Sequence, residues 1–213
     1  MKKAIGLILV FVLALTALVG CGNSDSGEGS ADNGNTDITV VSREEGSGTR
    51  DGFTELMGIK VDDVDKTTSA AEISNSTSVV MTTVAGNANA IGYISLGSLN
   101  DTVKAVKVDG VEATVENILA DEYPIYRPFN IVTNSNNDLS ALAQDFITFI
   151  MSKQGQDIIT EEGYISEAES PAEYTQQNGL SGRIVLAGST SVSPVMETLA
   201  DAYKEMYPDV EIE

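Results

Sequence analysis

Histidine is absent from this 213-residue sequence, cysteine occurs once, and lysine and arginine together number 12 against 32 acidic residues. Without histidine, the chain cannot use an imidazole as a general base or as a metal ligand. The single cysteine, Cys21, leaves no disulfide, so core packing alone must stabilise the fold. The formal net charge of −20 argues against nucleic acid as a partner, because phosphate backbones are bound by patches of lysine and arginine.

The same absences argue against an enzyme that acts on phosphate esters. A serine nucleophile needs a neighbouring base, and no such base is evident in the sequence. Residues 44–50, EEGSGTR, lack the Gly-Lys-Ser/Thr of a nucleotide-binding P-loop. The acids of residues 61–65, VDDVD, lack the loop glycine and terminal glutamate of a calcium site, so we interpret them as a solvated acidic turn. The sequence therefore predicts a protein that is not an enzyme and that has neither a metal site nor a cofactor.

A long apolar run, residues 5–19, follows Lys2 and Lys3 and is shorter than a comfortable membrane span. It ends in Leu-Val-Gly-Cys21, which resembles a bacterial lipobox, a signal in which the cysteine becomes the lipid-modified first residue. We therefore expect residues 1–20 to be a lipoprotein signal peptide; the alternative is an ordinary secretory signal with a cysteine there by chance. Residues 21–37, rich in Gly, Ser, Asn and acids, are predicted to be a flexible tether. The expected location is the extracellular face of the cell membrane, with the lipid anchor as the membrane contact.

Beyond the tether, short apolar segments alternate with segments of helical periodicity, which predicts an α/β fold. The chain is expected to form a first α/β lobe over residues 38–125 and second-lobe segments over residues 126–213. Strands are predicted at residues 38–41, 90–94, 103–108, 126–132 and 184–187 and from residue 210; helices are predicted at residues 51–57, 77–85, 115–120, 139–151, 154–161 and 194–206.

Two turns share one design, a strand followed by Gly, Ser and Thr and then a helix: residues 42–49 and residues 188–193. Such a turn directs backbone N–H groups and the positive end of the helix dipole at one point. Glycine allows close approach and the hydroxyls add donors, so the turn can hold an anion. Arg43 would add a full charge and a forked pair of donors. The alternative for each turn is a plain helix cap.

Neighbouring polar residues are explained without a ligand. We expect Arg50 to cap a helix or pair at the surface, and residues 74–78, SNSTS, to cap a helix. Glu44 and Glu45 are expected to orient Arg43 or to face solvent.

Four segments resemble the periplasmic-type phosphate-binding protein of the ABC phosphate transporter. They are VVSREEGSGTRDGF at residues 40–53, AIGYISLGSL at 90–99, RPFNIVTN at 127–134 and GSTSVSPVMETLADAYKEMYPDVEIE at 188–213. The resemblance covers nearly everything from residue 38 to residue 213. It implies two lobes of the type II periplasmic-binding-protein kind that close on a ligand.

The resemblance also implies a function. The chain would be a lipid-anchored solute-binding protein that captures inorganic phosphate, without a cofactor, and delivers it to the permease subunits of an ABC transporter. The phosphate-binding residues implied by the matching motifs are Arg43, Ser47, Gly48, Thr49, Thr190 and Ser191.

The order of the segments departs from the family. The GSTSV segment normally precedes the SREEGSGTR segment, whereas here it follows, and the part that would follow VEIE is absent. That part carries an acid in the family; a carboxylate can accept a hydrogen bond from protonated phosphate but repels ionised sulfate. We therefore expect either a circularly permuted protein or an incomplete one, and a paralogue that binds another oxyanion or needs a partner chain remains an alternative.

Overall fold

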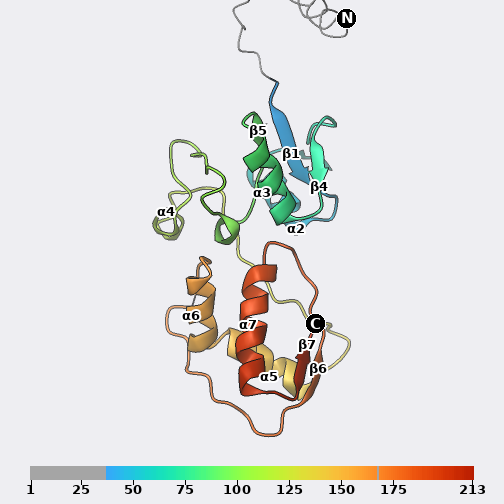
Figure 1. The fold of residues 1–213 in the computed structure, drawn as a ribbon, viewed down its shortest axis with the longest axis vertical. Helices are drawn as coiled ribbons and strands as arrows, with labels where there is room; N and C mark the ends of the chain where they lie inside the picture. Colours follow the sequence, from blue (N-terminus) through green and yellow to red (C-terminus); the bar gives the residue numbers. More distant parts are fainter. Residues whose placement is uncertain (1–36, 167) are drawn as a thin grey trace, which may run out of the picture. The chain divides into compact units, whose positions relative to one another are not determined.

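Strand β1 (Thr39–Arg43) is the centre of a three-stranded parallel sheet in the order β4–β1–β5 (Figure 1). Its first three residues are β-branched, a side-chain type that fits a pleated, buried surface. Strand β4 (Glu72–Ser74) lies on one side and β5 (Ala90–Ile91) on the other. Because the strands are parallel, the carboxyl ends of β1 and β4 lie at the same edge of the sheet.

The structure, a computed structural model, describes residues 37–166 and 168–213. The predicted signal peptide, Cys21 and all of the predicted tether except Asp37 lie outside these residues. Residues 37–213 cluster as one unit by their contacts.

A helix follows each of the strands β1 and β4. Helix α2 (Gly48–Leu56) and helix α3 (Thr77–Gly86) both pack against β1, and Figure 1 shows α3 beside it. Ser47 and Ser76 cap the two helices, since each hydroxyl accepts a hydrogen bond from a backbone N–H three residues later. Both helices therefore begin at the carboxyl edge of the sheet.

The acidic segment after α2 is a hairpin of β2 (Lys60–Val61) and β3 (Val64–Asp65). Asp62 and Asp63 form its two-residue turn, with φ of 51° and 59°. Two consecutive left-handed residues match the twist of a hairpin, and aspartate tolerates that conformation. Both side chains are exposed, so the prediction of a solvated acidic turn is confirmed for them, whereas Asp65 is partly buried and pairs with Arg50.

Two predicted strands are wrong. Residues 103–108 contain no strand, and Val108 instead bridges to Val111 across a tight turn. Residues 126–132 also form no strand, and Phe129 and Val132 are 51% and 87% exposed. Apolar composition favoured burial there, but a strand also needs a neighbour for its backbone hydrogen bonds, and no described strand pairs with this segment. The strand predicted at 90–94 is limited to β5.

Between β5 and residue 140 the regular elements are short. They are the 3₁₀ turn η1 (Leu96–Ser98) and helix α4 (Val115–Leu119), the latter close to its predicted range.

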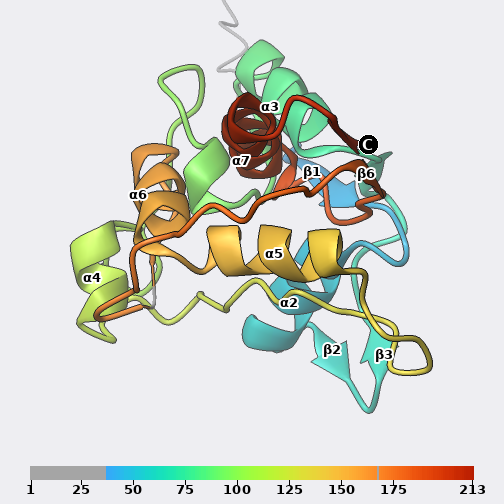
Figure 2. The ribbon, with the colours of Figure 1, turned by 90° about the horizontal axis from the view of Figure 1, so that it is seen from below.

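The second half of the chain contains three helices that pack together, α5 (Ala141–Ile150), α6 (Lys153–Glu161) and α7 (Ser193–Met206) (Figures 1 and 2). Strands β6 (Gly182–Ile184) and β7 (Val210–Ile212) form a parallel pair beside them. These helices and β7 match their predictions, whereas β6 begins and ends earlier than the predicted strand at 184–187. Within the described ranges, none of the helices combines the length and the apolar character that a membrane crossing requires.

The main hydrophobic core lies between these helices and the β6–β7 pair. On α5, Leu142, Phe146 and Ile150 are buried, whereas Leu139, which precedes the helix, is exposed. Phe146 packs edge-on against Tyr203 of α7 with ring centroids 4.9 Å apart. The other fully buried members are Phe149, Tyr164, Ile184, Val195, Leu199, Ala200, Tyr207 and Val210.

A polar cluster ties the long loop of residues 170–181 to this core. Asp145 of α5 accepts hydrogen bonds from the hydroxyls of Tyr203, at 2.7 Å, and of Tyr174. Burial and the hydrogen bond to Asp145 raise the pKa of both tyrosines, so both remain neutral donors. The partly buried carboxylate thus has hydrogen-bond partners, and the loop is held against α5 and α7.

The junction of α5 and α6 leaves no room for a side chain at Gly155. A Cβ there would lie 2.3 Å from the carbonyl oxygen of Phe149, whereas a Cβ on Gly86, also helical, would meet nothing within 4 Å. We expect Gly155→Ala to lower the free energy of unfolding by about 2–3 kcal/mol, because backbone must move. Gly86→Ala should leave it unchanged or raise it by less than about 1 kcal/mol. Urea unfolding measures both; equal stability of the two variants would contradict the close approach.

Candidate anion-binding site

The two predicted anion turns come together, although they lie far apart in sequence. The hydroxyl oxygens of Thr49 and Ser191 are 2.6 Å apart across 142 residues. Those of Thr77 and Thr190 are 3.3 Å apart across 113 residues. The loop before α7 therefore meets the starting turns of α2 and α3 at the carboxyl edge of the sheet.

Arg43 ends β1 at this edge and is 2% exposed. Its Nε and Nη2 donate to the two carboxylate oxygens of Glu44 at 2.8 and 2.9 Å, and its Nη1 lies 3.4 Å from the hydroxyl of Thr77. The hydrogen bond from Arg43 is the main cause that lowers the pKa of Glu44. Glu44 thus orients Arg43, as expected, and Glu45 is exposed. The forked pair leaves the Nη1 side of the guanidinium directed at the hydroxyl groups.

The first turn of α2 supplies backbone donors next to Arg43. Gly46, at φ 81°, turns the chain from β1 into α2, a conformation that favours glycine. Ser47 is buried and caps the helix. Gly48 and Thr49 follow as the first helical residues, whose N–H groups have no partner within the helix. These amides, with the dipole of the helix, can hold an anion.

The second turn is held in place from behind. Ser191 is fully buried, and its carbonyl oxygen accepts a hydrogen bond of 2.6 Å from the hydroxyl of Tyr164. The Tyr164 ring packs on Gly97, where a Cβ would lie 2.5 Å from a ring carbon. Burial is the main cause that raises the pKa of Tyr164, so it stays a donor. Val192 occupies the N-terminal cap of α7 without a side-chain hydrogen bond, and Ser193 is the first helical residue.

Thr77 belongs to the site but was not predicted there. The segment around it was interpreted as a helix cap, and Ser76 does perform that role. The next hydroxyl, that of Thr77, lies 3.4 Å from Arg43, 3.3 Å from Thr190 and 3.5 Å from Ser191. The signal that could have found it was the repetition of one design, since a strand again leads through serine and threonine into a helix.

Two side chains support Arg43 through its backbone. The Tyr93 hydroxyl accepts a hydrogen bond of 3.0 Å from the N–H of Arg43, and the Tyr93 ring stacks on Phe53 at 4.1 Å. Arg50 donates to the carbonyl oxygen of Arg43 at 2.8 Å and pairs with Asp65 at 2.6 Å. The expectation that Arg50 forms an ion pair is therefore confirmed.

The arrangement combines hydroxyls from three turns, the free amides of a helix start and one guanidinium. All of these groups can donate hydrogen bonds to the oxygens of a small oxyanion. Across the described ranges, no group of three or more acidic or thiol side chains is placed to hold a metal ion.

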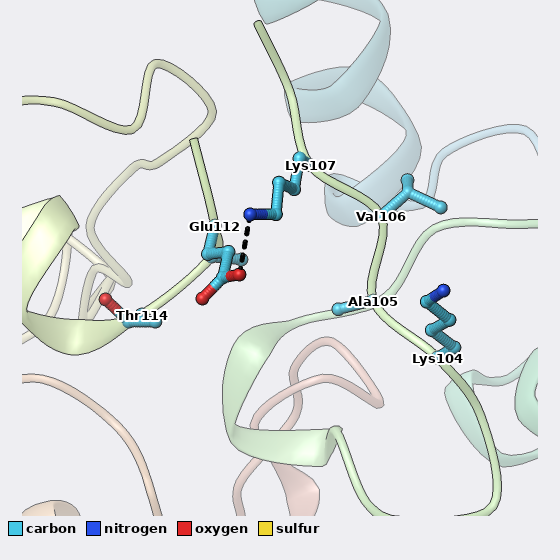
Figure 3. A pocket seen from close by; sticks show the side chains of 7 residues that line it. Lys104, Ala105, Val106, Lys107, Glu112 and Thr114 are labelled. Atoms are coloured by element: carbon cyan, nitrogen blue, oxygen red, sulfur yellow. Dashed lines mark ion pairs between the residues drawn. The ribbon is translucent and has the colours of Figure 1, made fainter. Parts of the chain in front are cut away.

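A separate cavity of about 500 Å³ lies elsewhere, lined by residues 104–107 and 112–114 (Figure 3). An ion pair of 2.8 Å between Lys107 and Glu112 crosses it. None of the residues of the anion site lines this cavity, and nothing in it points to a ligand.

The chain is similar to one family of known proteins. A family model for the PBP superfamily domain matches residues 24–154. The chain is 52% identical over 200 residues to phosphate-binding protein PstS 2 of Streptococcus pneumoniae TIGR4, covering 92% of this chain and 67% of that protein. It is 46% identical over 221 residues to phosphate-binding protein PstS 2 of Streptococcus agalactiae 2603 V/R, covering 100% and 73%.

Solved structures agree. The crystal structure of a phosphate-binding protein of a phosphate ABC transporter from Streptococcus pneumoniae TIGR4 matches with TM-score 0.66 and 54% identity, covering 83% of this chain and 69% of that one. A phosphate ABC transporter substrate-binding protein from Clostridium perfringens, solved with bound phosphate, matches with TM-score 0.57 and 47% identity, covering 62% and 52%.

The pairing of Arg50 with Asp65 links the site to pH. The hydroxyl and the N–H of Thr67 donate to Asp65 and lower its pKa from 3.8 to about 2, and Arg50 adds to the effect. A lowered pKa stabilises the fold above pH 3.8, and this stabilisation is lost as the pH falls towards about 2. Asp65→Asn should therefore be less stable than the parent by about 1 kcal/mol near neutral pH, after allowing for solvent screening, and equal to it near pH 2.

Urea unfolding across this pH range tests the expectation. Thr67→Val should lose part of the same stabilisation, and Thr68→Val, one residue along, serves as the control. Parallel stability curves for Asp65→Asn and the parent would show that the carboxylate is not stabilised in this way.

Proposed function

Because the chain belongs to the PstS family of phosphate-binding proteins within the PBP superfamily, we propose that it captures inorganic phosphate outside the cytoplasm for an ABC transporter. The observation that carries the proposal is that the hydroxyls of three turns meet one another, with that of Thr77 3.4 Å from the buried guanidinium of Arg43. The members of this family are binding proteins, and the chain is not an enzyme. Phosphate is its ligand, and no cofactor takes part.

The donors of the site suit a tetrahedral anion. The hydroxyls of Thr49, Thr190 and Ser191 are hydrogen-bonded to other hydroxyls, and each can rotate about its C–O bond to donate to a ligand oxygen. Arg43 adds the charge, and the amides at the start of α2 add donors that need no reorganisation. The related Clostridium perfringens protein was solved with bound phosphate, which supports this assignment. The residues proposed to bind phosphate are Arg43, Ser47, Gly48, Thr49, Thr190 and Ser191.

The proposal includes a membrane anchor and a hinged architecture. Cys21 carries the lipid, residues 21–37 form the tether, and the lobes of residues 38–125 and 126–213 close on phosphate before its transfer to the permease subunits. The sequence that ends in Leu-Val-Gly-Cys21 supports the anchor. The argument for two lobes is that groups of the site come from both ranges, since Thr49 meets Ser191.

Phosphate must stabilise the folded protein if it binds there. At a phosphate concentration of one hundred times Kd, the free energy of unfolding should rise by about 2.7 kcal/mol, which thermal unfolding detects as a higher Tm. Calorimetric titration with phosphate and with sulfate gives the affinity and the anion preference. Unchanged melting at millimolar phosphate, together with no heat of binding, would overturn the proposed function.

The hydroxyl of Thr49 is the group to remove with least disturbance. Thr49→Val keeps the side-chain volume and should weaken phosphate binding by about tenfold, since a hydrogen bond to a charged group contributes about 1.5 kcal/mol or more. Thr148→Val is the matched control, because Thr148 is exposed on α5 and its hydroxyl bonds only to its own helix. Calorimetry measures both; similar affinities for the two variants would remove Thr49 from the site.

A further inference from the structure

Arg127 lies against the first turns of α2, and the site described above does not use it. Its Nη2 donates to the carbonyl oxygen of Gly48 at 2.5 Å. A Cβ on Gly48 would lie 3.2 Å from Nη2, and a Cβ on Gly52 would lie 2.6 Å from Nε and 2.7 Å from Cζ. The guanidinium therefore occupies the space that side chains at these two positions would fill.

The two glycines form a seat for this side chain. Gly48 and Gly52 are four residues apart and share one face of α2. A glycine inside a helix is less favourable than alanine by about 1 kcal/mol, so the helix is weakened at this position. Gly52 is nonetheless buried, and the three nearest atoms around its would-be side chain all belong to Arg127. The close approach of Arg127 gives a physical reason for glycine here.

The charge of Arg127 is close to the proposed ligand. The nitrogen and the carbonyl oxygen of one residue are at most about 4 Å apart, so Nη2 lies within about 7 Å of the Gly48 nitrogen. That distance is shorter than the Debye length of about 8 Å at physiological ionic strength. An anion held by the Gly48 amide would therefore be attracted by the charge of Arg127.

Among the described residues, no acidic side chain forms an ion pair with Arg127. Glu55, one turn further along α2, is paired with Lys60 at 2.8 Å, and the more distant charge of Arg127 makes a smaller contribution to lowering the pKa of Glu55. Arg43, in contrast, is paired with Glu44. The field of Arg127 is therefore not offset by a direct partner.

We propose that Arg127, seated on Gly48 and Gly52, is a second cation of the anion site, which strengthens binding of multiply charged oxyanions through its charge without contacting them. This inference rests on the proposed function. On this proposal Gly52 contributes to anion binding indirectly, because the absence of a side chain there leaves room for Arg127.

The test uses inorganic phosphate, calorimetry, and four variants of the full chain: Arg127→Gln, Arg127→Lys, Gly52→Ala and the double variant Gly52→Ala/Arg127→Gln. At low salt, about 0.02 M, we expect Arg127→Gln to weaken binding by about tenfold, and at about 1 M salt by less than about twofold. Arg127→Lys should recover most of the affinity because it keeps the charge. A purely structural role would give the same loss at both salt concentrations.

Gly52→Ala tests the seat. The new methyl group displaces Arg127, so phosphate binding should weaken by about fivefold at low salt, whereas the double variant should bind no worse than Arg127→Gln alone. Gly86→Ala, a helical glycine with open space around it, is the matched control and should bind as the parent does. Thermal unfolding of each variant confirms that it is folded.

The outcomes are distinct. Parent affinity for Arg127→Gln at low salt, or an equal loss at both salt concentrations, overturns the role of Arg127 while leaving the proposed function intact. Additive losses in the double variant overturn the seat. If the parent itself does not bind phosphate, the proposed function and this inference both fall.

Discussion

A buried positive charge determines the organisation of the site. Removing a guanidinium from water is unfavourable unless its donors are satisfied, and Arg43 is 2% exposed. Glu44 satisfies two of its nitrogens in a forked pair, and Thr77 approaches a third. Its backbone is held as firmly, because Tyr93 accepts from its N–H and Arg50 donates to its carbonyl oxygen. Arg43 stands at the end of the central strand β1. The first turns of α2 and α3 lie around this point.

The acidity of the chain and an anion site are compatible because most of the donors carry no formal charge. A net charge of −20 acts over the whole surface and is screened by salt, whereas an amide or a hydroxyl acts at hydrogen-bond distance. Hydroxyls such as those of Ser47, Thr49 and Ser191 can therefore donate to an anion without altering the net charge.

Local features of the fold could be predicted from the sequence, and contacts between distant segments could not. The helices α5, α6 and α7 follow from apolar periodicity, and the strand–turn–helix around Ser47 follows from its glycines and hydroxyls. The segment of residues 126–132 was predicted as a strand because its composition favours one, but pairing depends on a neighbouring strand that composition does not reveal. Thr77 was missed because a capping role explained its segment locally.

The meeting of Thr49 with Ser191 illustrates the same limit, since nothing in either turn encodes a partner 142 residues away. The residue types of each turn indicated that it can hold an anion. Only the fold brings the two turns close enough to hold the same anion. Arg127 is similar: its sequence context gives no hint that Gly48 and Gly52 leave space for it.

The two arginines beside α2, Arg43 and Arg127, differ in burial and in their ion pairs. Arg43 is buried and paired with Glu44, so it offers a charged donor that is held in one orientation. Arg127 is exposed and forms no ion pair among the described residues, so its charge is less directly offset than that of Arg43. Glu44 is ionised, with a lowered pKa, and both of its oxygens accept from Arg43. It is therefore poorly placed to accept a proton-bearing ligand oxygen as well.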